Sequence, residues 1–266
     1  MRVPILFPLL ASSCLVAAPV ADATVDLPSG KVFYRDSLGA GVPVVFLHAG
    51  SGTSMLWEFQ IPVFTRAGYR FMAINYRGVS GGGDGPALIA ELADKLGIEK
   101  FHLLGTAAGG GVAFQFALAH PSRLRSLVVT NSIGNVRDEE YVAMGRRIRP
   151  APWFGQLPLE FRELGPSYRA ANPEGVKRWL ALSGREAAAA SPAGIEVTWA
   201  RLETLRVPTL LLTGDADLYT PPAVLQLFTA HMKQARSTVI PGTGHSSYWE
   251  NPEAFNRAVL EFLRRH

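Results

Sequence analysis

Short apolar runs alternate along the chain with longer segments whose apolar side chains recur at helical spacing. The run Val42–His48 is almost wholly apolar, which is typical of a strand buried on both faces of a sheet. The segment Pro86–Leu96 places its leucine and isoleucine residues on one side of a helix. This alternation predicts an α/β fold, a mostly parallel sheet with helices on both faces. The other predicted strands are Thr24–Leu27, Lys31–Ser37, Phe71–Tyr76, Phe101–Gly105, Ser126–Asn131, Val207–Thr213 and Ser237–Ile240, and the other predicted helices are Met55–Ala67 (with a break or late start at Pro62), Gly109–His120, Pro222–Met232 and Pro252–Arg264.

Residues 133–200 interrupt this alternation. They contain several prolines, two helix-like pieces at Glu139–Ile148 and Pro173–Leu182, and no clear strand. Insertions this long between core strands are seldom structureless. We therefore expect a helical cap or lid, with residues 24–132 and 201–266 forming the core. Extra helices that only enlarge the core are the alternative.

The first 23 residues have the layout of a secretory signal peptide. Arg2 precedes the uncharged apolar run Val3–Val20, and Ala21-Asp22-Ala23 offers a small-x-small cleavage site. A membrane anchor is the competing interpretation, but the run is barely long enough and contains three prolines. Leu10-Ala11-Ser12-Ser13-Cys14 also resembles a lipobox, in which Cys14 would carry a lipid. The sequence thus predicts export to the periplasm or medium, and no membrane attachment unless Cys14 is lipidated.

Composition excludes several classes of protein. The 266 residues are 48% hydrophobic and 18% charged, unlike a disordered chain. The net charge of +4 is small and the basic residues are scattered apart from Arg146, Arg147 and Arg149, so we expect no nucleic-acid partner. Cys14 is the single cysteine, which excludes a multi-Cys metal cluster, and the few His residues lack ligand spacing on a common element. We expect neither a metal nor a cofactor.

Polar and glycine-rich segments follow the predicted strands. Ligands of open parallel sheets bind beyond the carboxyl ends of the strands. There the chain carries His48-Ala49-Gly50-Ser51-Gly52, Gly105-Thr106-Ala107-Ala108-Gly109, Gly214-Asp215-Ala216-Asp217 and, last, Gly244-His245. An acidic residue at one strand end followed by a late histidine is the order of a hydrolase triad.

From about residue 24 to residue 266 the chain resembles the α/β-hydrolase fold family, of the small-esterase and C–C-hydrolase type. His48-Ala49-Gly50-Ser51-Gly52 is similar to its HGxG oxyanion loop, and Tyr76-Arg77-Gly78 to its strand-4 exit. The segment from Gly214 to Pro221 is similar to the GxxDxxxP acid loop, and Gly244-His245 with Glu250 and Pro252 to the GHxxxxExP pattern. The resemblance implies that Asp217, rather than Asp215, pairs with His245 as the base, and that the backbone N–H groups of Gly50 and Ala108 form an oxyanion hole.

The chain departs from the family at the nucleophile. The elbow G-x-S-x-G has become Gly105-Thr106-Ala107-Ala108-Gly109, so Ala107 occupies the position of the catalytic serine. A methyl group cannot attack a carbonyl. Three explanations compete: an engineered Ser→Ala change that traps substrate, a natural enzyme in which His245 and Asp217 act on water or on an acidic substrate proton, and a non-catalytic small-molecule binding protein.

The substrate is the least determined feature. The aromatic residues of the insertion, among them Trp153 and Phe154, would form an apolar pocket with few polar groups. Ser51 lies in the oxyanion loop and could face that pocket. We therefore expect a small, largely apolar ester, lactone or C–C substrate, held by Ser51, Trp153 and Phe154.

Overall fold

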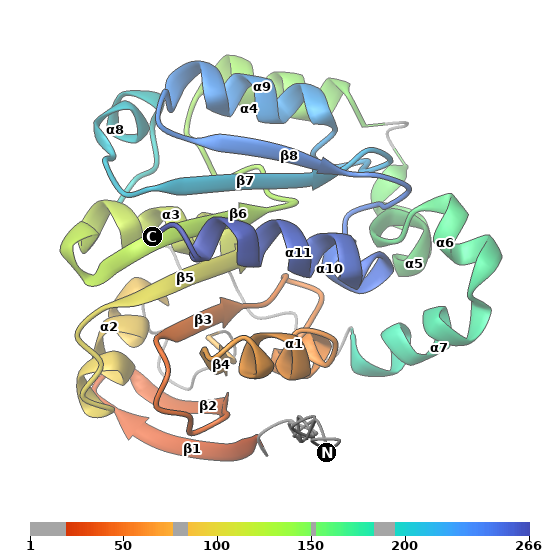
Figure 1. The fold of residues 1–266 in the computed structure, drawn as a ribbon. Coiled ribbons are helices and arrows are strands. Elements are labelled where there is room, and N and C mark those ends of the chain that lie inside the picture. Colours follow the sequence, from red (N-terminus) through yellow and green to blue (C-terminus); the bar gives the residue numbers. More distant parts are fainter. Residues whose placement is uncertain (1–19, 77–84, 150–152, 184–194) are drawn as a thin grey trace, which may run out of the picture.

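An eight-stranded sheet forms the centre of the molecule (Figure 1). The computed structural model describes residues 20–76, 85–149, 153–183 and 195–266. The strands are β1 (Ala21–Leu27), β2 (Gly30–Asp36), β3 (Pro43–Leu47), β4 (Arg70–Ile74), β5 (Phe101–Thr106), β6 (Leu124–Thr130), β7 (Thr209–Gly214) and β8 (Arg236–Ile240). Their order is β1-β2-β4-β3-β5-β6-β7-β8, and only the β1–β2 and β2–β4 pairs are antiparallel. The mostly parallel sheet predicted from the sequence is confirmed.

Helices cover both faces of this sheet, as the alternating pattern predicts. They are α1 (Ile61–Arg66), α2 (Gly85–Lys95), α3 (Ala108–Ala119), α4 (Glu139–Arg147), α5 (Leu159–Glu163), α6 (Pro166–Ala171), α7 (Pro173–Leu182), α8 (Trp199–Thr204), α9 (Pro222–His231), α10 (Ser247–Glu250) and α11 (Pro252–Leu263), with short 3-10 helices η1 (Ser54–Trp57), η2 (Pro121–Arg123) and η3 (Phe154–Gln156). Leu88, Phe114 and Phe228 of α2, α3 and α9 lie in one apolar core. Phe64 and Phe255 of α1 and α11 lie in the other.

The predicted elements exist, with ends that differ by a few residues. The predicted helix Met55–Ala67 is in fact two pieces, η1 and α1. Pro62 lies in the first turn of α1, where a missing N–H needs no helical partner, so the proline marks a late helix start. The two predicted N-terminal strands form a hairpin: Leu27 pairs with Gly30, which has a φ of 124° that suits glycine alone.

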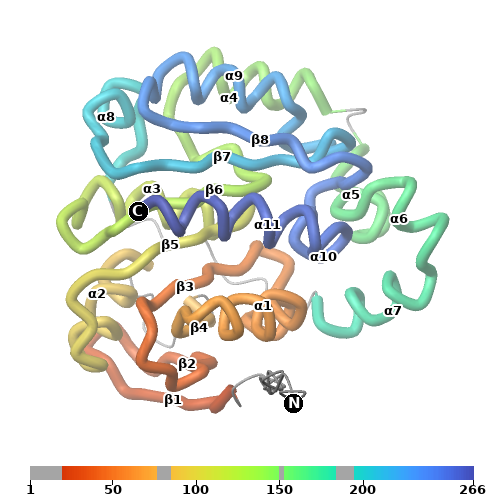
Figure 2. Tube along the Cα trace, viewed as in Figure 1, coloured from red at the N-terminus to blue at the C-terminus, as the bar shows by residue number. Residues whose placement is uncertain are grey.

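The described residues of the insertion between β6 and β7 form helices and no strand, but these helices occupy two places. In α4 the ring of Tyr141 lies 5.1 Å from that of Trp199 and 6.1 Å from that of Phe228, so this helix joins the core beside α9. Helices α5, α6 and α7 instead lie at the end of the sheet toward which the parallel strands point (Figures 1 and 2). Only this second part stands where a lid would be.

The predicted signal peptide overlaps the fold at one end. Residues 1–19, and Cys14 with them, lie outside the described residues. Ala21, Asp22 and Ala23, however, are the first residues of β1, where Asp22 accepts a 2.9 Å hydrogen bond from Nε of Arg35. Across the described part of the chain, no helix has both the length and the apolarity to cross a membrane.

Candidate active site

The turn between β5 and α3 keeps the geometry of a nucleophile elbow. Ala107 has φ 50° and ψ −115°, a conformation that is strained for any residue with a side chain. The flanking glycines are required by space: a Cβ on Gly105 would lie 2.2 Å from the carbonyl oxygen of Gly109. Ser132 stabilises the turn, because its hydroxyl donates a 2.6 Å hydrogen bond to the carbonyl of Ala107. The backbone of the elbow is therefore intact, although its apex carries only a methyl group.

The loop after β3 lies against the same turn. A Cβ on Gly109 would meet the carbonyl oxygens of Leu47 and His48 at 2.6 and 2.7 Å, so the first turn of α3 packs directly on the start of that loop. His48 is buried in the loop, with its Nδ1 2.7 Å from the carbonyl oxygen of Ala49, as expected of a structural histidine. Ala108, the first residue of α3, has an N–H without an intrahelical partner.

His245 and Asp217 meet at the ends of β8 and β7. Nδ1 of His245 lies 2.9 and 2.8 Å from the two carboxylate oxygens of Asp217. Both side chains are buried. Because the carboxylate occupies Nδ1, the second ring nitrogen of His245 is left for chemistry. The structure thus brings together the two residues chosen from the sequence, and Asp215 is instead exposed, its carboxylate accepting a hydrogen bond from the N–H of Thr243 at 3.2 Å.

Besides facing His245, Asp217 accepts hydrogen bonds from donors in two other segments. The N–H groups of Tyr219 and Thr220 donate to Oδ1 at 2.8 and 3.0 Å, and the hydroxyl of Thr220 donates to Oδ2 at 2.6 Å. Asn131 adds a 3.0 Å bond from its amide to Oδ2 and another to the carbonyl of Gly244. Sequence reasoning did not single out Asn131; its place at the end of the predicted strand Ser126–Asn131 was the available signal.

The charges of the pair stabilise each other. Burial raises the pKa of Asp217, but the charge of His245 and the hydrogen bonds from His245, Thr220 and Asn131 outweigh burial and hold this pKa well below its usual range. Burial lowers the pKa of His245, but Asp217 beside it outweighs burial and raises that pKa to about 9. The arrangement therefore favours an imidazolium next to a carboxylate, which is the state a general base reaches after taking a proton.

Two further carboxyl groups, neither assigned a role from the sequence, lie beside this pair. Glu163, the last residue of α5, is 7% exposed, and among the described residues its Oε2 has no hydrogen-bond partner. Burial raises the pKa of Glu163 above its usual range, and the charge of Asp217 adds to the rise; His245, Arg162 and the hydroxyl of Ser51 offset only part of it. Glu250 accepts hydrogen bonds from the N–H groups of Gly165 and Gly244 at 2.7 and 3.0 Å. Glu163 has no local signal in the sequence, because only the tertiary fold carries it to the site.

The two aromatic residues predicted to bind substrate, Phe154 and Trp153, differ in burial. Phe154 is buried and its ring lies 5.0 Å from that of Tyr219, which in turn lies 4.5 Å from the ring of His245. Trp153 is 55% exposed, so it does not form a buried wall of the site. Arg149, from the basic cluster, has its guanidinium 5.7 Å from the centre of the Tyr219 ring. Tyr219 is thus the aromatic contact of His245 that sequence reasoning did not select.

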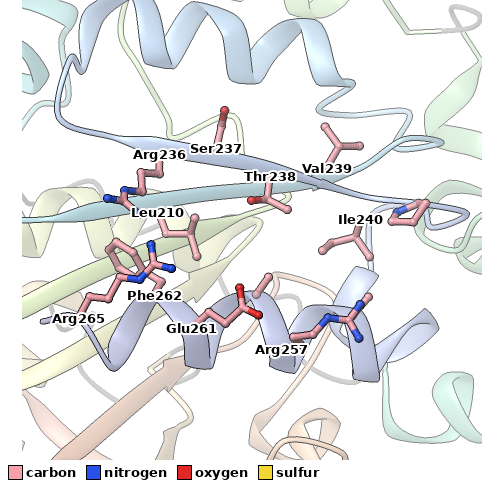
Figure 3. A pocket seen from close by; sticks show the side chains of 13 residues that line it. Leu210, Arg236, Ser237, Thr238, Val239, Ile240, Arg257, Glu261, Phe262 and Arg265 are labelled. Carbon is pink, nitrogen blue, oxygen red and sulfur yellow. The ribbon is translucent and has the colours of Figure 1, made fainter.

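A separate cavity of about 350 Å³ lies between the edge strand β8 and α11 (Figure 3). Arg236, Thr238, Arg257 and Arg265 are among its lining residues, and none of the predicted site residues lines it. Within the part of the chain that the structure describes, no group of three or more His, Cys, Asp or Glu side chains could hold a metal ion.

Comparison with known proteins assigns the chain to a family. Residues 44–258 match the model of the alpha/beta hydrolase family. The chain belongs to this family. A 2-hydroxy-6-oxononadienedioate/2-hydroxy-6-oxononatrienedioate hydrolase of Burkholderia vietnamiensis is 27% identical to it over 88% of this chain and 91% of that protein. A 2-hydroxy-6-oxo-6-phenylhexa-2,4-dienoate hydrolase of Burkholderia cepacia is 26% identical over 89% and 92%.

Solved structures show the same fold. An esterase of Thermogutta terrifontis superimposes with a TM-score of 0.75 at 24% identity, covering 92% of this chain and 98% of that one. The family resemblance drawn from the four sequence motifs is confirmed, and with it the α/β-hydrolase fold. Membership makes this protein a hydrolase-type enzyme.

Proposed function

We propose that the protein hydrolyses a small, largely apolar ester, lactone or C–C substrate without a serine nucleophile. The observation that carries the proposal is the buried His245–Asp217 pair, hydrogen-bonded at 2.8 and 2.9 Å at the same edge of the sheet as an elbow that bears only a methyl group. His245 takes a proton from water, and that water attacks the substrate carbonyl directly. Asp217 holds the imidazole tautomer and stabilises its charge.

The developing oxyanion needs donors that do not depend on the apex side chain. In this proposal the backbone N–H groups of Gly50 and Ala108 supply them, aided by the positive end of α3. The packing of Gly109 on the carbonyl oxygens of Leu47 and His48 supports this, since it sets the two backbone segments side by side. Phe154 and Ser51 line the substrate site, and α5 to α7 act as its lid.

The relatives support the substrate class at a coarse level. Proteins named as hydrolases of 2-hydroxy-6-oxo dienoates match along most of this chain, and so does a protein named as an esterase. Both names denote hydrolysis of a substrate that contains a carbonyl group, and a base with an oxyanion hole assists attack on a carbonyl carbon.

The test is steady-state hydrolysis of p-nitrophenyl acetate by the chain itself, by His245→Ala and by Ala107→Ser. We expect turnover by the chain itself, a loss of about 10³-fold or more in His245→Ala, and a faster reaction with a p-nitrophenol burst in Ala107→Ser. Turnover by Ala107→Ser alone would contradict serine-free hydrolysis. If neither form turns over any ester but a ligand binds tightly, the protein is a binding protein.

We further propose that the chain is exported by way of its first 23 residues. The mass of the mature protein tests this. Cleavage after Ala23 would remove the first three residues of β1 and the Arg35–Asp22 ion pair, so cleavage closer to residue 20 would preserve more of the sheet. A lipid-modified mass, lost in Cys14→Ala, would instead establish a lipoprotein. An unprocessed N-terminus would contradict export.

A further inference from the structure

Glu163 is the buried carboxyl group of the site that the proposed mechanism leaves unused. It ends α5, it is more than nine-tenths buried, and its Oε2 has no hydrogen-bond partner in the described part of the chain. Burying a polar atom without a partner destabilises a fold. An unpaired acceptor in such a place points to a ligand that pairs with it.

The carboxyl group of Glu163 has electrostatic partners on two loops of the candidate site. Its carboxyl group interacts with His245, on the loop after β8, and with the hydroxyl of Ser51, on the loop after β3. Arg162, the adjacent cation, is engaged elsewhere, donating to the carbonyl of Leu157 and to the hydroxyl of Tyr219 at 3.1 and 3.2 Å. Glu163 is therefore within electrostatic reach of both the base and the oxyanion loop.

Glu250 fixes this position. It accepts the N–H of Gly165, just beyond Glu163 in the chain, and the N–H of Gly244, just before His245. The two glycine backbones touch, because a Cβ on Gly244 would lie 2.5 Å from the nitrogen of Gly165. The insertion is therefore joined to the histidine loop by contacts at Gly165, two residues after Glu163, and at Gly244, directly before His245.

A water nucleophile needs one acceptor more than a serine does. A serine hydroxyl carries one proton, which the histidine takes. A water molecule carries two, and both must point away from the substrate carbon so that a lone pair can face it. His245 accepts the first. The side chain of Ala107 has no polar atom that could accept the second.

We infer that Oε2 of Glu163 accepts the second O–H of the attacking water, which makes Glu163 a catalytic residue contributed by the insertion. The inference rests on the proposed serine-free hydrolysis. In the step, the water oxygen bonds to the carbonyl carbon while one proton moves to the free nitrogen of His245. The other proton stays on that oxygen, hydrogen-bonded to Glu163. The bond to the leaving group then breaks, and His245 returns its proton to the leaving group.

The test separates steps that use water from steps that do not. Glu163→Met removes the acceptor at similar size, Glu163→Gln keeps one acceptor oxygen, and Glu160→Met is the control on the same helix. Each is made in the chain itself and in Ala107→Ser, where the burst reports serine attack and the steady state reports attack of water on the acyl-enzyme. The substrate is p-nitrophenyl acetate, and thermal melting of each variant reports folding.

In the chain itself we expect Glu163→Met to lower kcat about 10- to 100-fold, Glu163→Gln to recover most of it, and Glu160→Met to have no effect. The melting temperature should stay equal or rise, since an unpaired buried acceptor is removed. In Ala107→Ser, the same change should slow deacylation and spare the burst.

Three results decide between the proposals. If the chain itself is inactive but Glu163→Met slows only deacylation in Ala107→Ser, the serine-free function fails and the role of Glu163 stands. If Glu163→Met changes neither kcat nor deacylation by more than about twofold, the inference is wrong. If burst and deacylation slow equally, Glu163 is structural and the inference is again wrong.

Discussion

Two parts of the candidate site differ in completeness. One is the elbow after β5, and the other consists of the acid and histidine loops after β7 and β8. The elbow has the strained backbone of the family motif, with Ala107 at φ 50°, but it carries a methyl group where that motif has the serine hydroxyl. The loops keep every part: Asp217 receives hydrogen bonds from Tyr219, Thr220 and Asn131 as well as facing His245. The conformation of the turn therefore does not require a serine at its apex, because packing around the glycines, rather than the apex side chain, determines it.

Removing the charge of Asp217 tests the loop side most severely. Asp217→Asn should lower kcat by about 10²- to 10⁴-fold, because an amide that donates to His245 favours the wrong tautomer and leaves the imidazolium unstabilised. Initial rates with p-nitrophenyl acetate measure the loss, and circular dichroism checks the fold. Asp215→Asn is the matched control, since Asp215 is exposed and an amide oxygen can still accept the N–H of Thr243. A loss below tenfold in Asp217→Asn would mean that the His245–Asp217 pair does not contribute to catalysis.

The pH profile tests whether His245 works as the base. Burial lowers its pKa, but Asp217 outweighs burial, and Glu163 and Glu250 add to the rise, to about 9. Only the neutral imidazole can take a proton, so kcat/KM should fall as pH drops below the pKa, by about tenfold per pH unit. Glu163→Gln removes one of the charges that raise this pKa and should move the rising limb to lower pH. A flat profile from pH 7 to 9 would contradict base catalysis by His245.

Gly244→Ala tests how far the histidine loop depends on the insertion. The added Cβ would lie 2.5 Å from the nitrogen of Gly165 and 2.9 Å from the carbonyl carbon of Leu164, which are backbone atoms that cannot move aside. We expect a loss of about 1–3 kcal/mol in the free energy of unfolding, measured by urea denaturation, together with reduced activity. At Gly155 a Cβ would meet nothing within 4 Å, so Gly155→Ala should leave both unchanged. Equal effects in the two variants would show that the contact is unimportant.

The smallest effect concerns the strain that the elbow retains. Ala107→Gly should raise the free energy of unfolding by about 1 kcal/mol, because glycine adopts φ 50° and ψ −115° without a Cβ clash. Ala113→Gly, in the middle of α3, should instead lower it, since glycine there costs helix stability and buried contact. Melting curves of both variants measure these changes in stability. A lower melting temperature for Ala107→Gly would show that the turn is not strained.

The order of strands and helices, the family and the His245–Asp217 pair were predictable because each depends on local signals: apolar runs, turn residues and short motifs at strand ends. Element ends were less predictable, as Met55–Ala67 shows. The split of the insertion was not predictable at all. In α4, Tyr141 packs on Trp199 and Phe228, whereas α5 to α7 go to the strand ends, and nothing in their own periodicity distinguishes the two destinations.

The sequence by itself determined which residues stand at the strand ends and that a methyl group stands where a hydroxyl is expected, because parallel strands present their carboxyl ends at one edge whatever surrounds them. Only the tertiary structure decided what faces that edge. Asn131 supports Asp217 from the neighbouring strand, and Glu163 reaches His245 from the insertion, held there by Glu250. These contacts join segments far apart in the chain, and the value of a carboxyl group as a partner or an acceptor depends on its burial and its neighbours, which no local pattern contains.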